Sequence, residues 1–251
     1  MIKSIQNSVS KGLLRPVRKV GLAMARSWPW PVSARIGTGQ SMYVDLRSSV
    51  SRGIFIKGEF DPNVFGPIRT VLRPGDTFLD IGANVGYYSM LALDMVGSSG
   101  RVHAFEIDER PLRCLRKTKT TQKLDNFLIN AVAIGDQTGK VKFHQDKDDC
   151  GNSHLASDGK GREVQMITLD EWFARTKPSK VRAIKMDIEG AEILALRGAQ
   201  RFIEEHRPLW VCEAWDSNSE KIGEVGSFLQ GLGYQIEILK NVHSPIVVAR
   251  P

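Results

Sequence analysis

The sequence lacks the features of secreted, membrane-spanning and zinc-binding proteins. Its 251 residues include three cysteines, an odd number without a C-x-x-C pair, which indicates reduced thiols and neither a disulfide framework nor a zinc site. No apolar run approaches the roughly 18 residues that a membrane span needs. The longest early run, residues 20–25, is also too short for a secretory signal. These absences predict a cytoplasmic protein.

Signals of nucleic-acid modification are missing as well. The chain has no Asn/Asp-Pro-Pro-Tyr box for an adenine amine and no Pro-Cys pair to attack a pyrimidine. Aromatic residues make up 8% of the chain and do not alternate with basic ones, as a base-stacking platform requires. An enzyme that modifies nucleic acid, with its basic N-terminus on the phosphates, is therefore kept only as the alternative prediction.

Acidic residues are absent before Asp45, and this absence concentrates the net charge. Residues 1–60 carry ten Lys/Arg against two acids, a charge of +8, so the other 191 residues carry −1 of the total of +7. Apolar residues at helical spacing lie among these charges, and Trp28 and Trp30 end the pattern. Such a segment could contact an anionic membrane, pack over the site or direct targeting. We therefore expect residues 1–30 to include an amphipathic helix, with packing on the domain as its first candidate role and peripheral contact with the inner face of the membrane as the second.

After this N-terminal segment, strand patterns alternate with helix patterns. This alternation predicts an α/β fold with a mostly parallel sheet and helices on both faces. The expected extension covers residues 1–57, with an antiparallel strand pair at 42–46 and 53–57, and the expected catalytic domain covers 58–251. In the domain we expect strands at 77–81, 101–106, 127–134, 140–144, 164–168, 182–187, 209–213, 234–240 and 245–249. We expect helices at 62–72, 87–95, 110–122, 169–174, 191–205 and 219–232, and a polar loop at 145–162.

The most informative stretch is TFLDIGANVGYYS, residues 77–89. It predicts an apolar strand that ends at Asp80, a turn with Gly82 and Gly86, and a helix. Such a turn bares backbone N–H groups at a helix N-terminus, where a carboxylate or phosphate can bind. Dinucleotide sites have the spacing G-x-G-x-x-G. The D-x-G-x-x-x-G spacing here adds Asp80, which can pair with the ammonium of a methionine moiety, so it predicts an S-adenosylmethionine site.

Two further strand ends carry acids. Glu106 ends the next strand, 20 residues after the second glycine, where a carboxylate can accept both hydroxyls of a ribose. Asp187 ends a later strand in IKMDIEGAE, so Asp187 and Glu189 should face the same crevice as the glycine turn. Asp187 could act as a general base, a metal ligand or an anchor for a substrate hydroxyl. Glu192 is better explained as a helix cap.

Taken together, these segments resemble the FkbM-type methyltransferases. The resemblance runs from about residue 58 to residue 214 and is carried, in order, by GANVGYYS (82–89), FE (105–106), NAVAIGD (130–136), ITLD (167–170) and KMDIEGAE (185–192). It implies a Rossmann-like class I methyltransferase fold with a seven-stranded sheet, S-adenosylmethionine as the donor and methyl transfer to oxygen. The acceptor that it implies is a sugar hydroxyl on a glycolipid, polysaccharide or glycosylated secondary metabolite.

The same resemblance implies a role for each matching residue. Those at the methionine moiety would be Asp80, Gly82, Ala83, Asn84 and Gly86. Glu106 would hold the ribose, residues Asn130, Ala131 and Val132 would border the adenine, and Asp187 and Glu189 would lie at the reaction centre.

The chemistry adds two expectations. A sugar hydroxyl needs a base to remove its proton, and Asp187 is the first candidate, with His154 in the polar loop as the second. A metal-dependent variant would gather Asp187, Glu213 and Asp216 around Mg²⁺, which prefers oxygen ligands. A site without a metal is the favoured prediction.

Overall fold

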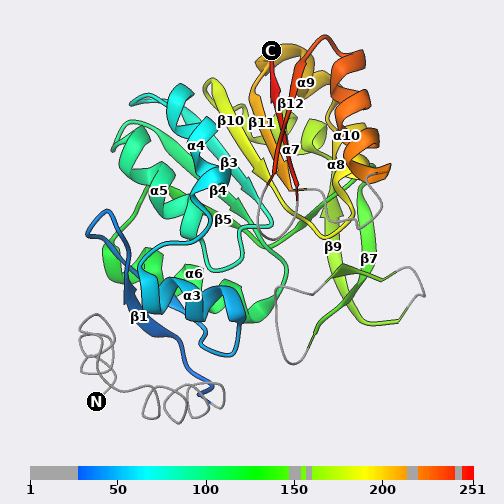
Figure 1. Cartoon of the computed structure of the whole chain (residues 1–251). Helices are drawn as coiled ribbons and strands as arrows, with labels where there is room; N and C mark the ends of the chain where they lie inside the picture. The colour runs from blue at the N-terminus through cyan, green and yellow to red at the C-terminus, as the bar shows by residue number, and fades with distance from the viewer. Residues whose placement is uncertain (1–27, 147–153, 157–159, 214–219, 241–244) are drawn as a thin grey trace.

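A computed structural model describes residues 28–146, 154–156, 160–213, 220–240 and 245–251. They form three layers, in which a central sheet lies between two layers of helices (Figure 1). The predicted amphipathic helix falls outside the described residues, so its membrane contact stays a prediction, although Trp28 and Trp30 are both exposed. In the described ranges, no helix is both long and apolar enough to cross a membrane.

The central sheet has seven strands in the order β12-β13-β11-β10-β3-β4-β5. They are β3 (Thr77–Ile81), β4 (Arg101–Phe105), β5 (Phe127–Asn130), β10 (Val181–Met186), β11 (Leu209–Glu213), β12 (Gln235–Leu239) and β13 (Ile246–Arg250). Five strands from β5 to β11 are parallel, whereas β13 is antiparallel to both of its neighbours. The predicted mostly parallel sheet and the closing hairpin are therefore confirmed.

Helices cover both faces of this sheet (Figure 1). One face carries α4 (Pro62–Val71), α5 (Tyr87–Val96) and α6 (Glu109–Gln122), and the other carries α7 (Leu169–Thr176), α8 (Glu192–Arg197), α9 (Gln200–His206) and α10 (Glu220–Gly231). Phe78 packs in the first hydrophobic core and its neighbour Leu79 in the second. Because successive strand residues point to opposite faces, a strand buried on both faces needs an unbroken apolar run.

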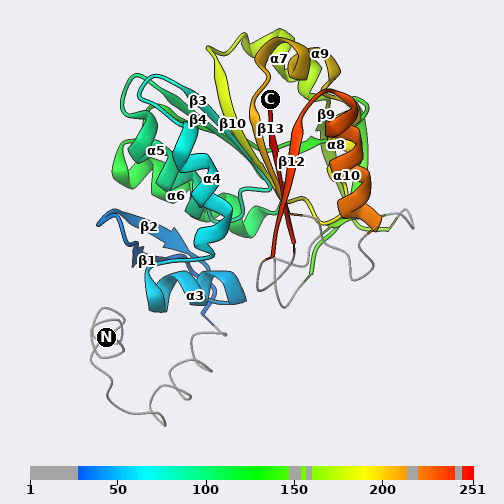
Figure 2. The same ribbon diagram turned by 45° about the horizontal axis from the view of Figure 1, so that its top comes forward.

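Two smaller sheets flank the central one. The first contains β6 (Ala133–Ile134), β7 (Gly139–His144), β8 (His154–Leu155) and β9 (Arg162–Ile167). The second is an antiparallel pair of β1 (Val32–Arg35) and β2 (Ser41–Val44), which lies with α3 (Ser49–Lys57) beside α6 (Figure 2). The Tyr43 N–H fastens this pair to α6 by donating to Thr118 Oγ1 at 2.9 Å.

The predicted pairing of residues 42–46 with 53–57 is wrong. Residues 53–57 belong to α3, and β2 pairs with β1 instead. Ile54 and Phe55 suit a strand, but together with Ser51 they form a buried helical face. Gly58 ends the helix with a φ of 75°. Burial of this apolar face therefore outweighs the local strand propensity of Ile54 and Phe55.

Two other predicted elements are divided in the structure. The strand predicted at 127–134 divides into β5 and β6, which belong to different sheets. The helix predicted at 191–205 divides into α8 and α9 at Gly198, where a Cβ would lie only 2.1 Å from the carbonyl oxygen of Gly135. The loop predicted at 145–162 contains β8, and much of the remainder lies outside the described residues.

Candidate active site

The carboxyl ends of β3, β4, β10 and β11 meet at one edge of the central sheet, where a cavity of about 800 Å³ opens. Its walls also include parts of α3, the start of α4 and the four-stranded sheet. The volume lies within the roughly 300–1,000 Å³ of small-molecule sites. Because ligands of open α/β sheets bind at this edge, the cavity is the candidate active site.

Unusual backbone conformations gather at this cavity. Six non-glycine residues in the described part of the chain have a positive φ, and three of these end helices, where the left-handed conformation is ordinary. The other three all line the cavity: Asp61, Asn84 and Glu189. Residues held in sparsely populated conformations cluster at functional sites, which supports this location.

The glycine turn, residues 82–86, lines the cavity along most of its length. Gly82 is required there, because its φ is +74° and a Cβ would lie 1.8 Å from the carbonyl oxygen of Asp187. All five N–H groups of the turn donate within the protein. Those of Gly82 and Ala83 reach the carbonyl oxygen of Phe105 at 3.0 and 2.9 Å. The prediction that this turn bares its backbone N–H groups is therefore wrong for residues 82–86, since each of these groups already donates to an acceptor within the protein.

Gly86 and Asp80 lie behind the cavity wall. At Gly86, a Cβ would lie 2.5 Å from Leu115 Cδ2, so this glycine allows α5 and α6 to pack closely. Asp80 is fully buried, and its Oδ2 accepts a hydrogen bond from Ser89 Oγ at 2.6 Å. Lys185 Nζ lies 3.8 Å from the other oxygen, Oδ1. This placement favours an indirect role for Asp80 over the predicted direct contact with a ligand ammonium.

Glu106 lines the cavity beside the glycine turn. Its Oε2 accepts the N–H of Asn84 at 2.8 Å, and its Oε1 accepts those of Ile107 and Asp108, each at 2.7 Å. Burial raises the pKa of this carboxyl to about 7, and the three N–H groups oppose the rise. A carboxylate held this firmly is preorganised, and its remaining lone pairs can accept ligand hydroxyls.

Of the three residues predicted to border the adenine, all within the described part of the chain, only one lines the cavity. Val132 lines the cavity together with Ala133 and Ile134. Asn130 instead donates its side-chain amide to the carbonyl oxygens of Ala104 and Leu128, at 3.3 and 3.4 Å. Asn130 and Ala131 lie outside the lining that the described residues form. Contact with an adenine therefore stays a prediction, and Val132 is the best placed of the three.

Asp187 and Glu189 both line the cavity, on the turn that follows β10. Asp187 Oδ2 lies 3.5 Å from Lys185 Nζ, and the Asp187 side chain is 28% exposed. Glu189 has a φ of 54°, and burial is the main cause that raises its pKa to about 8. Glu192 holds this turn by accepting the N–H groups of Ile188 and Gly190 at 3.0 and 3.2 Å, in agreement with its predicted capping role.

His154 also reaches the cavity, from the four-stranded sheet. Its ring is exposed and lies 5.4 Å from that of His144 on β7. The arm formed by β7 and β8 therefore brings a titratable side chain to the site. Whether His154 acts as a base stays a prediction.

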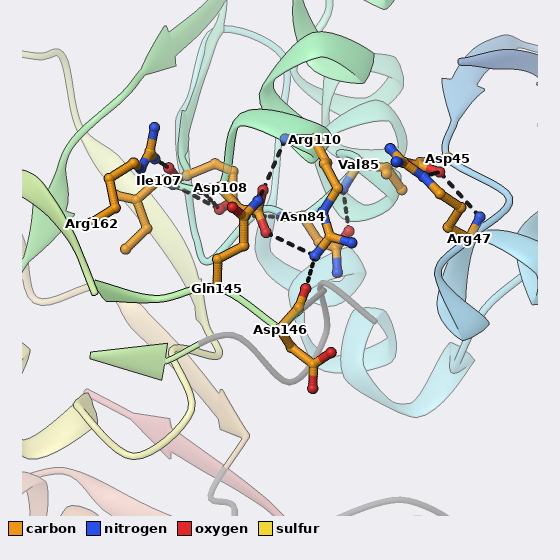
Figure 3. Close-up of polar contacts among 11 residues, drawn as sticks. Asp45, Arg47, Asn84, Val85, Ile107, Asp108, Arg110, Gln145, Asp146 and Arg162 are labelled. Carbon is orange, nitrogen blue, oxygen red and sulfur yellow. Dashed lines mark hydrogen bonds and ion pairs between the residues drawn. The ribbon is translucent and has the colours of Figure 1, made fainter. Parts of the chain in front are cut away.

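A polar network fastens this arm to the loop that carries Glu106 (Figure 3). Gln145 Nε2 donates to Asp108 Oδ1 at 2.7 Å, and Arg110 donates to the carbonyl oxygen of Asp146. On β9, Arg162 donates to the carbonyl oxygen of Ile107. The arm and the Glu106 loop are thus joined by side chains that sequence spacing alone does not relate.

The structure also shows cavity residues without a role in the sequence prediction. Lys185 is buried at the centre of the site, and Phe60 and Tyr88 supply aromatic rings to the cavity. A signal for Lys185 does exist in the sequence. On a strand, residues two apart point to the same face, so a lysine two positions before Asp187 should share its side of the sheet.

No metal site can be assigned from the described residues. Among them, no group of three or more His, Cys, Asp or Glu side chains could hold a metal ion. Asp216, the third predicted ligand, lies outside the described ranges. The Mg²⁺ variant therefore stays untested.

The fold and the site together define a class I methyltransferase dependent on S-adenosylmethionine. The methyltransferase FkbM domain model matches residues 80–236, and the chain belongs to this family. The predicted family is therefore confirmed.

Two relatives agree with this assignment. The chain is 24% identical over 198 residues to the 31-O-demethyl-FK506 methyltransferase FkbM of Streptomyces tacrolimicus, covering 66% of this chain and 75% of that one. It is also 24% identical over 153 residues to the 2-O-methyltransferase NoeI of Sinorhizobium fredii (strain NBRC 101917 / NGR234), covering 54% of this chain and 62% of that one. Both relatives are named as O-methyltransferases, which confirms the predicted enzyme class.

Solved structures share the fold. Methyltransferase FkbM from Methylobacillus flagellatus KT matches with a TM-score of 0.53 and 20% identity, over 78% of this chain and 52% of that one. Precorrin-6y C5,15-methyltransferase from Geobacter metallireducens GS-15 matches with a TM-score of 0.51 and 15% identity, over 82% and 94% of the two chains. The present chain thus spans about half the length of the first structure.

The site fits S-adenosylmethionine in three respects. Gly82 lines the cavity, and its lack of a side chain lets the turn lie directly against the backbone of Asp187, so the turn and the catalytic strand end meet at one site. Glu106 presents a preorganised carboxylate to the cavity, as a ribose requires. Asp80 Oδ1 is buried beneath the turn and lacks a hydrogen-bond donor among the described residues, which leaves a polar acceptor at this place.

Glu106→Ala should weaken S-adenosylmethionine binding roughly 10- to 100-fold, since a hydrogen bond to a charged acceptor contributes about 1.5–3 kcal/mol. In the wild type, affinity should also fall as the pH drops through about 7, because protonation removes the carboxylate acceptor. Calorimetry on both sides of that pH measures both effects. Glu106→Gln should lose the part of the pH dependence that is centred near 7; a variant that kept this part would contradict the assigned role.

Glu189→Gln should change kcat by less than about threefold at neutral pH, because the glutamine copies the protonated acid that predominates below its pKa. As the pH rises through about 8, the wild-type carboxyl ionises and attracts the cationic donor. The KM for S-adenosylmethionine should then fall in the wild type and not in the variant. Steady-state kinetics across this range measure the difference. A large loss of kcat at neutral pH would contradict the prediction.

Proposed function

We propose that this enzyme methylates a hydroxyl of a sugar, on a glycolipid, a polysaccharide or a glycosylated secondary metabolite. The observation that carries the proposal is the composition of the cavity lining outside the glycine turn. This lining combines the aromatic rings of Phe60 and Tyr88 with the carboxyl groups of Asp61, Asp187 and Glu189. Aromatic faces and carboxylates suit the apolar faces and the hydroxyls of a sugar ring.

The names of the two relatives support oxygen as the acceptor atom. One is named for a methyltransferase of 31-O-demethyl-FK506 and the other for a 2-O-methyltransferase. Neither name specifies the acceptor of the present enzyme, so the carbohydrate assignment depends on the cavity and on the family resemblance.

The mechanism assigns separate tasks to the protein. Bound S-adenosylmethionine supplies a methyl group that is already activated by its positive sulfur. The glycine turn and Glu106 would hold the donor, and the other lining residues would orient the acceptor hydroxyl; such alignment can contribute up to about 7–11 kcal/mol in the best cases. Asp187 accepts the hydroxyl proton, a contribution of roughly 10²–10⁴-fold in rate.

Incubation with methyl-labelled S-adenosylmethionine tests the proposal. The acceptors would be neutral alkyl glycosides, a total glycolipid extract and total RNA, each with wild type and with Asp187→Asn. We expect label as an ether on sugar, made by the wild type alone. Label on RNA alone would overturn the carbohydrate acceptor and favour the nucleic-acid alternative.

A further inference from the structure

Lys185 is a buried cation at the junction between the glycine turn and the catalytic strand end. It lies on β10 and is 3% exposed. Its Nζ donates to the carbonyl oxygen of Gly82 at 2.7 Å. The same atom lies 3.5 Å from Asp187 Oδ2, 3.8 Å from Asp80 Oδ1 and 5.6 Å from the centre of the Tyr88 ring. One side chain therefore contacts both halves of the site.

The charges around Lys185 explain why it can be buried. Burial disfavours an ammonium group, but Asp187, Asp80 and Glu213 together outweigh this cost and raise the pKa of Lys185. The ammonium lies between the carboxyl groups of Asp80 and Asp187 and offsets their charges. Without the ammonium, Asp80 and Asp187 would repel each other at the ends of adjacent strands.

We propose that Lys185 is a positioning residue that holds the glycine turn and Asp187 at a fixed separation, and so aligns the methyl donor with the acceptor hydroxyl. Lys185 engages Oδ2 of Asp187, which leaves Oδ1 to accept a hydrogen bond from the acceptor. It holds the turn through the carbonyl group of Gly82, directly beside the contact between Gly82 and the Asp187 backbone. The inference rests on the proposed function only for the identity of the acceptor.

The alternative is a purely structural role, in which Lys185 only neutralises the buried Asp80. Loss of Lys185 would then lower stability without lowering kcat in the folded protein. Three variants separate the two roles. Lys185→Met leaves Asp80 buried without its ion pair, so it can fail to fold for that reason alone. Lys185→Met with Asp80→Asn removes both buried charges together, and Asp80→Asn alone keeps Lys185 with Gly82 and Asp187. Lys140→Met is the control, because Lys140 is 60% exposed and pairs with Glu163 outside the cavity.

Activity is the first readout for these variants. We expect the double variant to fold and to bind S-adenosylmethionine within about tenfold of wild type, while kcat falls roughly 10²-fold, the loss that a misplacement of about 1 Å produces. Asp80→Asn should lose much less turnover, Lys185→Arg should restore part of it, and Lys140→Met should match the wild type. A folded double variant with the kcat of Asp80→Asn would overturn the proposal.

A second readout needs no acceptor. With saturating S-adenosylmethionine, the amides of residues 82–86 and 187–190 should exchange hydrogen faster in the double variant than in Asp80→Asn. Equal exchange in both proteins would overturn the positioning role. If the wild type methylates none of the glycans but this difference is observed, the proposed acceptor fails while the role of Lys185 stands.

Discussion

Asp187→Asn should lower kcat by roughly 10²–10⁴-fold, the contribution of a general base, while the Kd of S-adenosylmethionine changes by less than about threefold. The asparagine keeps the size of the side chain and cannot take up a proton at working pH. Donor binding should persist because the glycine turn lies against the backbone of Asp187, and the N–H groups that hold Glu106 come from other residues.

Single-turnover kinetics and calorimetry on the same protein would separate these two quantities. Loss of donor affinity in proportion to kcat would show that Asp187 supports the donor site and would exclude it as the base. His154→Gln provides the comparison, because His154 lies on the arm and not at the end of β10. If His154→Gln lost the larger share of turnover, the histidine would become the base.

Gly82→Ala should inactivate the enzyme and destabilise the fold. The new Cβ would lie 1.8 Å from the Asp187 carbonyl oxygen, whereas real Cβ contacts essentially never fall below 3.0 Å. The ends of β3 and β10 must therefore move apart by more than 1 Å. The positive φ adds about 1–2 kcal/mol for a residue with a side chain, and overpacking adds about 1–3 kcal/mol. A displacement of this size should cost roughly 10²-fold in turnover.

Gly75→Ala is the matched control for this variant. Gly75 also has a positive φ, of +91°, but the nearest atom to its Cβ would be Ser99 Oγ at 3.7 Å, an ordinary contact. Urea unfolding should therefore show only the conformational cost of about 1–2 kcal/mol, and kcat should be unchanged. Equal effects of the two alanines would show that φ, and not the contact with Asp187, explains the requirement for Gly82.

The sequence predicts the central sheet well for a physical reason. Strands such as β11 and β13 are buried over their first four residues and read there as apolar runs, LWVC and IVVA, so local composition carries the signal. The same reasoning fails at Ile54 and Phe55, because their burial depends on helix α3 packing against distant parts of the chain. The break at Gly198 has a similar cause, since it depends on a contact with Gly135, 63 residues earlier.

The sequence likewise predicts only part of the candidate site. Spacing along the chain brings Gly82, Glu106, Asp187 and Glu189 to one edge, because parallel strands end together. Spacing cannot show that the N–H groups of the turn are already bonded, since those of Gly82 and Ala83 find their acceptor on the next strand, at the carbonyl oxygen of Phe105. Nor does it show the contacts of Lys185 with Gly82 and Asp80, which cross from one strand to another.

The internally bonded turn has a consequence for ligand choice. A cell is crowded with nucleotides, sugar phosphates and free phosphate, and many proteins catch these anions with unpaired amides at a glycine-rich loop. Here each amide from Gly82 to Gly86 already has a partner inside the protein. A phosphorylated metabolite that entered would find these amides occupied and would face the carboxyl group of Glu106. The hydrogen bonds that stabilise the turn thus also bias the site against the most abundant competitors of its donor.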